Sequence, residues 1–544
     1  MKNRYQIDWE AYASCARQAA ADGAVLLRNE NHALPITSGK VAVFGRSQFN
    51  YYKSGTGSGG AVNTRTVKNI IDVLTDEQDL EVNEQVLSAY RTWLAGHPFE
   101  KGTGWASEPW SQEEMPLSAE FVKEAHRTSE IAIIIIGRTA GEDMDNTITK
   151  GSFLLTDTEE EMLRLVCAEF TCTIVVLNVG NIIDMKWVKA YQPSAVLYTW
   201  QGGQEGAAAV GDVLTGRVNP SGKLTDTIAY DIKDYPSTDD FGGETEDLYR
   251  EDIYVGYRYF ETFAKKAVLY PFGYGLSYTT FEITSNQTHY EKGHLSVMAM
   301  VRNTGNRAGR EVVQVYVEAP QGKLGKPARV LVGFAKTPLI EPGKEALVSI
   351  EAGDERFASY DDSGVTGFKS CFLLEEGRYH VYVGSDVRSA AVTYRFELPE
   401  LKIVDTCKEA LAPVQRFTRL KPVDTGDVDY QSRQESVPIR TIDLQARIAA
   451  EKLPQGTYAG DASGAAAATD AGSANGVAAA TDAGANVAAG VHTLREVLDR
   501  EITMQTFLSQ LTDQDLCCIV RGEGMSSPKV TPGTAAAFGG VTER

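Results

Sequence analysis

The chain has 544 residues, of which 43% are hydrophobic and 23% charged, so it is long enough for about three or four domains of ordinary globular composition. Its formal net charge of −20 disfavours nucleic acids and anionic membranes as partners. Residues 1–18 lack the apolar core of a secretory signal, and no apolar run is long enough to span a membrane. The 7 scattered cysteines include no CxxC pair, which favours reduced thiols in a cytoplasmic protein.

The N-terminal part of the chain predicts a helix followed by strands. Residues 8–30 have an amphipathic helical pattern that runs into a strand (AADGAVLLRNE), and Lys40–Gly45 predict another strand. In the segment that follows, Gly55, Gly57 and Gly60 satisfy the GxGxxG pattern. A dinucleotide site needs the first glycine directly after the strand, but here other residues separate the strand from Gly55. We therefore interpret the segment as a loop, either a plain turn or part of a different binding site.

The stretch from Ile131 to Phe153 (IAIIIIGRTAGEDMDNTITKGSF) predicts a buried strand followed by an acidic loop. Its isoleucine run shows no alternation, which is typical of a parallel strand with helices on both faces. The loop carries Glu142, Asp143 and Asp145. Ligands of open α/β sheets bind beyond the carboxyl ends of strands, and neighbouring like charges favour the protonated carboxyl group that a general acid requires. Two other interpretations stay open, a solvated loop that caps the next helix and an oxygen-ligand site for Ca²⁺ or Mg²⁺.

The next part of the chain alternates strands with helices. We predict strands at 131–136, 174–179 and 195–199, and helices at about 157–170, 182–190 and 204–215. This βαβ spacing predicts an α/β fold with a mostly parallel sheet. Glu205 opens the last of these helices and is a candidate second catalytic carboxylate, although the helix macrodipole by itself favours an acid there.

The order of these motifs resembles glycoside hydrolase family 3. The similar segments are GRTAGEDMD, TDTEEEMLRLVCAEF, TIVVLNVG, WQGGQEGAAAVGDVLTGRVNPSGKL, REDIYVGYRYFETF and LYPFGYGLSYTTF. In that family they belong to the second domain, an α/β sandwich, which we place at residues 1–285. The resemblance implies that Glu142 is the acid/base carboxylate that protonates the leaving oxygen of a glycosidic bond. It also implies that the glycine- and serine-rich loop lies over the sugar pocket, with Ser58 as the candidate substrate-binding residue.

A different pattern begins after the α/β part. From Leu295 to Leu398, short alternating runs separated by Gly, Pro and Asn turns predict an antiparallel β-sandwich. This part resembles the fibronectin type III-like domain that follows the α/β sandwich in many members of the family, and we place it at residues 286–400. Its role is either that of a packing scaffold or that of a surface for carbohydrate or for a partner.

The last part of the chain predicts a connection and the start of another domain. Residues 401–490 predict an irregular connection that includes an Ala/Gly-rich linker, since their near repeat cannot bury enough surface to fold. Residues 491–544 resemble the start of the family's first domain, a (β/α)8 barrel. This order resembles a circularly permuted subgroup in which the barrel comes last. Such a barrel needs about 250 residues, so the resemblance implies a truncated barrel.

The resemblance implies a retaining β-glycosidase, most simply a β-glucosidase acting on non-reducing ends, which needs two carboxylates. The family's nucleophile is an aspartate of the barrel in a Ser-Asp-Trp-like motif, which this sequence lacks. Its Asp8–Trp9 pair opens the first predicted helix, where an acid needs no catalytic explanation. We therefore expect the chain to be inactive alone. The alternative function is a non-catalytic carbohydrate-binding or assembly module. We expect a β-glucoside or oligosaccharide substrate, no nucleic acid or membrane partner, and no metal or cofactor, and we leave a homo-oligomer open.

Overall fold

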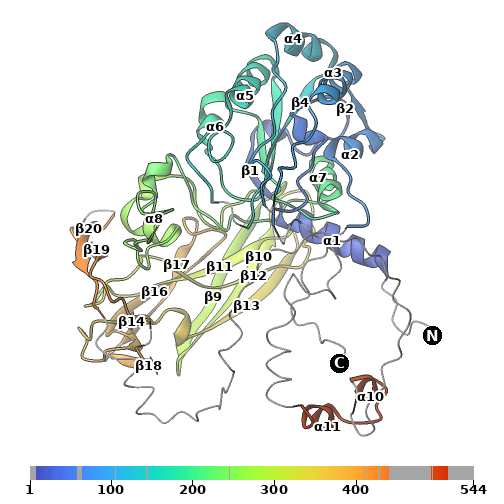
Figure 1. Ribbon diagram of the computed structural model, residues 1–544. Helices are drawn as coiled ribbons and strands as arrows, with labels where there is room; N and C mark the ends of the chain where they lie inside the picture. The colour runs from blue at the N-terminus through green and yellow to red at the C-terminus, as the bar shows by residue number, and fades with distance from the viewer. Residues whose placement is uncertain are drawn as a thin grey trace, which may run out of the picture. The chain divides into compact units, whose positions relative to one another are not determined.

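The computed structural model describes residues 8–57, 60, 64–104, 106–142, 145–243, 245–409, 411–426, 429–439, 492 and 494–511. The chain divides into two compact units, one formed by residues 1–60 and 64–441 and the other by residues 61–63 and 442–544. The first unit contains an α/β domain followed by a β-sandwich (Figure 1). Among the described residues, no helix is long and apolar enough to cross a bilayer.

The α/β domain is built on a six-stranded sheet with the order β1-β6-β5-β4-β2-β3. Strands β2 to β6 pair in parallel with one another, which confirms the predicted, mostly parallel sheet. Strand β1 pairs antiparallel with β6 at one edge. The strands are β1 (Val25–Asn29), β2 (Gly39–Phe44), β3 (Leu80–Val82), β4 (Ile131–Arg138), β5 (Cys172–Val179) and β6 (Ala195–Tyr198).

Helices cover both faces of this sheet (Figure 1). One core packs α3 to α6 against the sheet, and a second core packs α1, α2 and α7 against the opposite face. The helices are α1 (Trp9–Gly23), α2 (Ile70–Asp76), α3 (Glu84–Gly96), α4 (Ala119–Thr128), α5 (Asp157–Glu169), α6 (Lys186–Tyr191) and α7 (Gly206–Thr215). Short 3-10 turns lie at Glu30–His32, Arg46–Gln48, Ile232–Asp234, Lys265–Ala267 and Asp354–Arg356.

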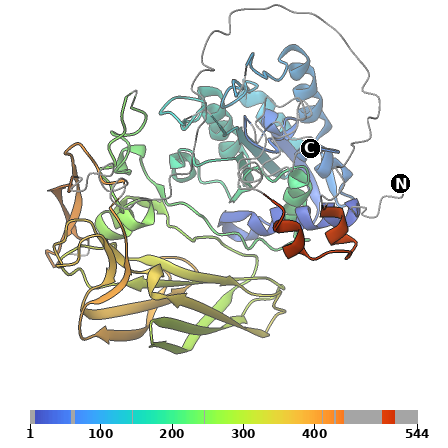
Figure 2. The ribbon, with the colours of Figure 1, turned by 60° about the horizontal axis from the view of Figure 1, so that its bottom comes forward.

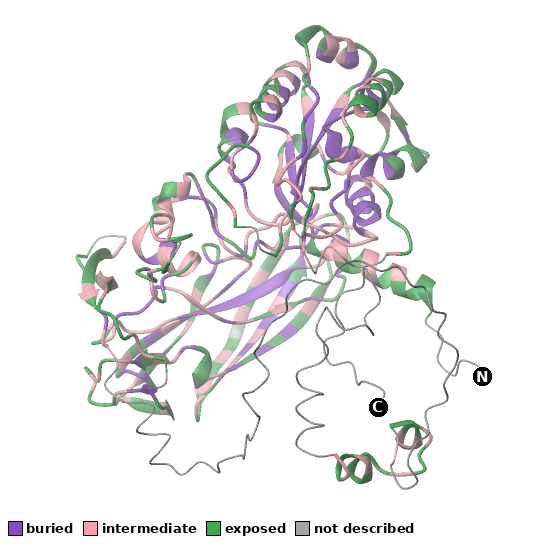
Figure 3. Cartoon of the chain, viewed as in Figure 1, coloured by how far each residue is buried: buried purple, intermediate pink, exposed green. Residues whose placement is uncertain are grey.

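Strand β4 explains why its sequence is a continuous apolar run. Ile134 and Ile136 belong to the core under α3 to α6, whereas Ile133 and Ile135 belong to the core on the other face. All four side chains are buried. Figure 3 colours much of the central sheet as buried. Because both faces of the strand are covered by helices, neither face accommodates polar residues, and alternation is lost.

The second part of the first unit is the predicted antiparallel sandwich. A sheet of order β13-β10-β9 faces a sheet of order β12-β11-β16-β17, and one apolar core joins them (Figure 2). Strand β9 begins at Phe281, before the start that we predicted for this domain. The strands are β9 (Phe281–Glu291), β10 (His294–Asn303), β11 (Val312–Glu318), β12 (Val330–Lys336), β13 (Glu345–Gly353), β16 (Gly377–Gly384) and β17 (Ala391–Leu398).

Smaller elements connect and extend the two domains. Helix α8 (Tyr257–Phe263) and the pair β7 (Ile228–Ala229) and β8 (Val268–Tyr270) precede the sandwich. A third sheet, of order β14-β15-β18, extends it. Its strands are β14 (Ser359–Asp361), β15 (Cys371–Leu374) and β18 (Lys402–Thr406).

The connection after residue 400 is more regular than the sequence predicted. Strand β18 pairs with β15, and β19 (Thr418–Val423) forms a hairpin with β20 (Gln431–Ser436). The prediction of an irregular segment was wrong here because strand pairing, rather than local apolar pattern, organises this polar stretch. The Ala/Gly-rich linker lies outside the described residues. In the second unit, the described residues form the helices α10 (Leu494–Leu498) and α11 (Met504–Leu508), and the barrel stays a prediction.

Candidate active site

The order of the strands creates a switch point between β2 and β4. From β2 the chain passes to β3 on one side, whereas β4 pairs with the other side of β2. At such a point the loops after neighbouring strands separate and leave a crevice, where open α/β sheets bind their ligands. The two loops here are the glycine-rich segment after β2 and the acidic segment after β4. The sequence had predicted both loops, but not that they are neighbours.

The two loops contact each other through their backbones. The amide of Thr56 donates a hydrogen bond of 2.7 Å to the carbonyl oxygen of Ala140, and Thr56 forms an isolated parallel bridge with Gly141. A Cβ atom at Gly55 would lie 1.9 Å from the same carbonyl oxygen, so only glycine permits this approach. The glycine-rich pattern therefore serves loop-to-loop packing.

Glu142 lies where these loops meet. Its side chain is exposed, and a Cβ atom built on Gly57 would lie 2.5 Å from its Cβ and 2.8 Å from its Oε2. The carboxylate therefore rests directly against the glycine-rich loop. Ser58, our candidate substrate-binding residue, follows Gly57 in the sequence but lies outside the described residues, as does Asp143. Asp145 is exposed.

A buried ion pair anchors the acidic loop. Arg138, the last residue of β4, is 0% exposed and donates hydrogen bonds of 2.6 Å to each carboxylate oxygen of Glu159. Its guanidinium also donates to the carbonyl oxygens of Ser152 and Leu154, at 3.1 and 3.4 Å. Glu159 in turn completes the capping box of α5 with Thr156. One buried guanidinium thus holds the beginning and the end of the loop that carries Glu142.

Buried polar groups fix the loop after β2 as well. Asn178 of β5 accepts a hydrogen bond from the amide of Tyr52 at 2.7 Å and donates to the carbonyl oxygen of Tyr52 at 3.0 Å. Glu114 accepts from the amides of Arg46 and Met115, each at 2.8 Å. Burial raises the pKa of Glu114 to about 7, despite these hydrogen bonds. Buried polar side chains of the α/β domain therefore hold both loops in place.

Sequence reasoning missed these anchoring residues. The pattern Thr-x-x-Glu at Thr156–Glu159 signalled the helix start, which accounts for Glu159 as a cap but not for its arginine partner. Nothing in the local pattern marked Arg138, Asn178 or Glu114, since each acts on a segment distant in sequence.

The two other carboxylates considered from the sequence lie at helix starts. Asp8 is the N-cap of α1 and accepts from the amides of Glu10 and Ala11, at 3.1 and 3.0 Å. Glu205 is at the N-cap position of α7, and its carboxylate accepts from the side-chain amide of Gln204 at 3.0 Å. These positions agree with the structural interpretation of both residues.

The described residues of the acidic loop do not form a cluster that could bind a metal ion. Within the part of the chain that the structure describes, no three His, Cys, Asp or Glu residues gather closely enough to hold a metal ion. Asp143 falls outside that part. Among the described residues, the exposed carboxylate of Glu142 lies directly against the glycine-rich loop, which suits transfer of a proton to or from a ligand in the crevice.

Two known protein families match parts of the chain, one in the α/β domain and one in the sandwich. Residues 24–278 match the glycosyl hydrolase family 3 C-terminal domain. Over these residues the α/β domain is therefore similar to the C-terminal domain of that family. Residues 311–387 match the fibronectin type III-like domain, which confirms the second predicted fold. The matched residues include β4 and the loops with Gly57 and Glu142.

Individual proteins resemble the chain beyond residues 24–278. A β-glucosidase of Ruminococcus albus is 48% identical over 539 residues, which cover 99% of this chain and 53% of the relative. β-Glucosidase A of Butyrivibrio fibrisolvens is 37% identical over 469 residues, which cover 78% of this chain and 55% of that protein.

Solved structures of β-glucosidases also resemble the chain. A β-glucosidase from Paenibacillus barengoltzii matches with a TM-score of 0.84 and 48% identity, over 98% of this chain and 56% of that chain. β-Glucosidase 3B from Thermotoga neapolitana, solved with α-D-glucose, matches with a TM-score of 0.67 and 36% identity, over 73% of this chain and 55% of that chain. The chain therefore spans about half the length of the relatives that it matches.

Proposed function

We propose that this chain is part of a retaining β-glucosidase and supplies the acid/base carboxylate, Glu142. The observation that carries the proposal is the position of Glu142 at the switch point of a domain that resembles the family 3 C-terminal domain, held against Gly57 by a loop with a buried anchor. The β-glucosidases that resemble the chain, at 48% and 37% identity, support the choice of a glucoside substrate.

Glu142 has a role in each half of the proposed reaction. In the first half, a nucleophilic carboxylate attacks the anomeric carbon, and Glu142 gives its proton to the leaving oxygen as the glycosidic bond breaks. In the second half, Glu142 takes a proton from the water that attacks the glycosyl-enzyme intermediate. Ser58, directly after Gly57, would bind a hydroxyl group of the sugar.

The order of domains in the proposed enzyme follows the permuted arrangement. We propose an α/β sandwich at residues 1–285, a fibronectin type III-like domain at 286–400, a connection at 401–490 and the start of a barrel at 491–544. The Ruminococcus albus relative supports this order, since it aligns with 99% of the chain and hence also with its last part. The Thermotoga neapolitana structure covers 73% of the chain.

The second carboxylate of the mechanism would come from the barrel. The sequence of residues 1–544 contains no Ser-Asp-Trp motif, and Asp8 of the Asp8–Trp9 pair caps α1. A glycosidase with only one of its two carboxylates loses the covalent step. We therefore propose that residues 1–544 hydrolyse no glycoside alone, and that a complete barrel restores activity.

The experiment measures hydrolysis of an aryl β-glucoside by this chain and by a version extended through a full barrel. We expect activity only from the extended protein. In the extended protein, Glu142→Gln should lower kcat about 10² to 10⁴-fold, and added azide or formate should restore part of the activity by replacing the missing acid/base.

Asp145→Asn is the matched control, because Asp145 lies on the same exposed loop. We expect this variant to keep wild-type activity. If Glu142→Gln is as active as the wild type, the acid/base assignment is wrong. An extended protein that binds glucosides but hydrolyses none would instead favour the alternative of a carbohydrate-binding or assembly module.

A further inference from the structure

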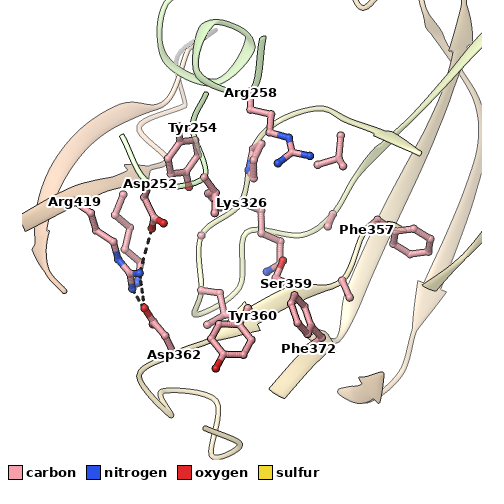
Figure 4. Close-up of a pocket in the computed structure, with 18 of the residues that line it drawn as sticks. Asp252, Tyr254, Arg258, Lys326, Phe357, Ser359, Tyr360, Asp362, Phe372 and Arg419 are labelled. Carbon is pink, nitrogen blue, oxygen red and sulfur yellow. Dashed lines mark hydrogen bonds and ion pairs between the residues drawn. The ribbon is translucent and has the colours of Figure 1, made fainter. Parts of the chain in front are cut away.

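A cavity of about 370 Å³ lies between the sandwich, the segment before α8 and the hairpin of β19 and β20. Its walls come from stretches that are far apart in the sequence, such as Asp252–Arg258, Phe357–Tyr360 and Arg419–Lys421 (Figure 4). Its volume falls in the range of small-molecule sites, about 300–1,000 Å³, which often form between domains. None of these residues belongs to the site around Glu142.

One wall of the cavity is an aromatic platform formed by Tyr360 and Phe372. The two residues are directly opposite each other on β14 and β15, so their side chains point to the same face of the sheet. Their ring centroids are 5.0 Å apart, and the residues are 38% and 39% exposed. The two ring planes are inclined by 49°, so the flat face of a ligand ring would stack on one of them with the other at its edge.

The polar groups beside the platform are largely paired with one another. Arg419 donates to Asp362 at 2.6 Å and forms ion pairs with Asp252 and Glu435, at 3.2 and 3.5 Å. Lys326 pairs with Glu375. Figure 4 shows the interactions of Arg419 with Asp362 and Asp252 at the cavity wall. The carboxylates that line the cavity near Arg419 therefore already have cationic partners.

Arg258 has no ion-pair partner among the described residues, and neither do the exposed Glu355 and Arg356 of the same lining. Arg258 is half-buried, and Figure 4 shows its side chain extending toward the cavity from the side opposite Tyr360 and Phe372. The described residues provide its guanidinium with neither an ion pair nor a hydrogen bond. Cationic side chains outnumber anionic ones in the lining, although the whole chain has 53 Lys and Arg against 73 Asp and Glu. A partly desolvated guanidinium without a partner favours a carboxylate, which it can bind through two parallel hydrogen bonds.

We propose that this cavity binds a short acidic saccharide, with one sugar ring on the aromatic platform and its carboxylate at Arg258. A sugar ring has apolar C–H faces and hydroxyl groups at its edge, and Ser359 and Asp362 flank the platform where such hydroxyl groups would lie. The site is independent of the reaction proposed at Glu142. It assigns a binding role to the fibronectin type III-like domain.

The test uses two sugars that differ only in the group at C6, methyl β-D-glucuronide and methyl β-D-glucoside. Their binding to the whole chain is measured by isothermal titration calorimetry. We expect the glucuronide to bind at least tenfold more tightly than the glucoside. Arg258→Gln should abolish this preference and Arg258→Lys should retain part of it, whereas Tyr360→Ala should weaken the binding of both sugars.

Arg395→Gln is the control, because Arg395 is exposed on β17 of the same domain and does not line the cavity. This variant should bind both sugars as the wild type does. Because the test measures binding and not hydrolysis, failure of the catalytic proposal leaves this one intact. The proposal is overturned if the glucuronide does not bind at millimolar concentration, if it binds no better than the glucoside, or if Arg258→Gln keeps the preference.

Discussion

Replacing Arg138 by methionine tests whether the buried ion pair holds the acidic loop. In Arg138→Met, Glu159 keeps a carboxylate that is only 4% exposed and has lost its cation. Removing one partner of a buried pair costs about 3–5 kcal/mol. The carbonyl oxygens of Ser152 and Leu154 also lose their donor, which adds roughly 1 kcal/mol. We expect the free energy of unfolding of the α/β domain to fall by about 5 kcal/mol, a large share of the 5–15 kcal/mol typical of a domain.

Tryptophan fluorescence during urea unfolding measures the free energy of unfolding of the α/β domain. All 6 tryptophans of the chain lie between Trp9 and Trp200, so the signal comes from the α/β domain and not from the sandwich. Arg164→Met is the matched control, because Arg164 pairs with Glu161 at the surface of α5, where both side chains are about half exposed. This control should leave the free energy of unfolding close to that of the wild type.

A double-mutant cycle separates the pair from its neighbours. Arg138→Met combined with Glu159→Met removes both charges from the interior, so the double variant should lose less stability than the sum of the single variants. The reasoning is refuted if Arg138→Met costs less than about 1 kcal/mol, or if the two substitutions are additive.

Three further substitutions test other parts of the α/β domain. Because burial raises the pKa of Glu114 from 4.5 to about 7, its contribution to stability is present below pH 4.5 and lost as the pH rises through 7. Compared with Glu114→Gln, the wild type should therefore lose about 3 kcal/mol between pH 4 and pH 8 in urea unfolding, and equal pH slopes would contradict this. Gly57→Ala would bring a Cβ to 2.5 Å from the Cβ of Glu142 at a φ of +71°. It should therefore lower kcat in the barrel-extended protein by more than any loss of folded protein accounts for. An unchanged kcat would show that this contact is not needed. Asp8→Ala removes the N-cap of α1 and should cost about 1 kcal/mol in urea unfolding without changing activity; loss of activity would reopen a catalytic role for Asp8.

Local patterns in the sequence determined the main elements of the fold. The isoleucine run predicted β4, and the structure places it at Ile131–Arg138 between two helical layers. Helix α5 was predicted at about 157–170 and is found at Asp157–Glu169. These predictions succeeded because an apolar run or a capping pattern acts over a few neighbouring residues, and any fold that uses them must bury the same side chains.

Only the tertiary structure decided how the site is assembled. The sequence marked Glu142 through resemblance, but the contact of its loop with Thr56 and Gly57 depends on β4 pairing with β2. The partnership of Arg138 with Glu159 likewise depends on how α5 packs against the sheet. The tertiary structure also decides that β1 pairs antiparallel with β6. It likewise brings together the distant segments that line the cavity at Arg258. Such contacts join residues far apart in the chain, and their geometry exists only after the sheet order and the packing of the domains are set.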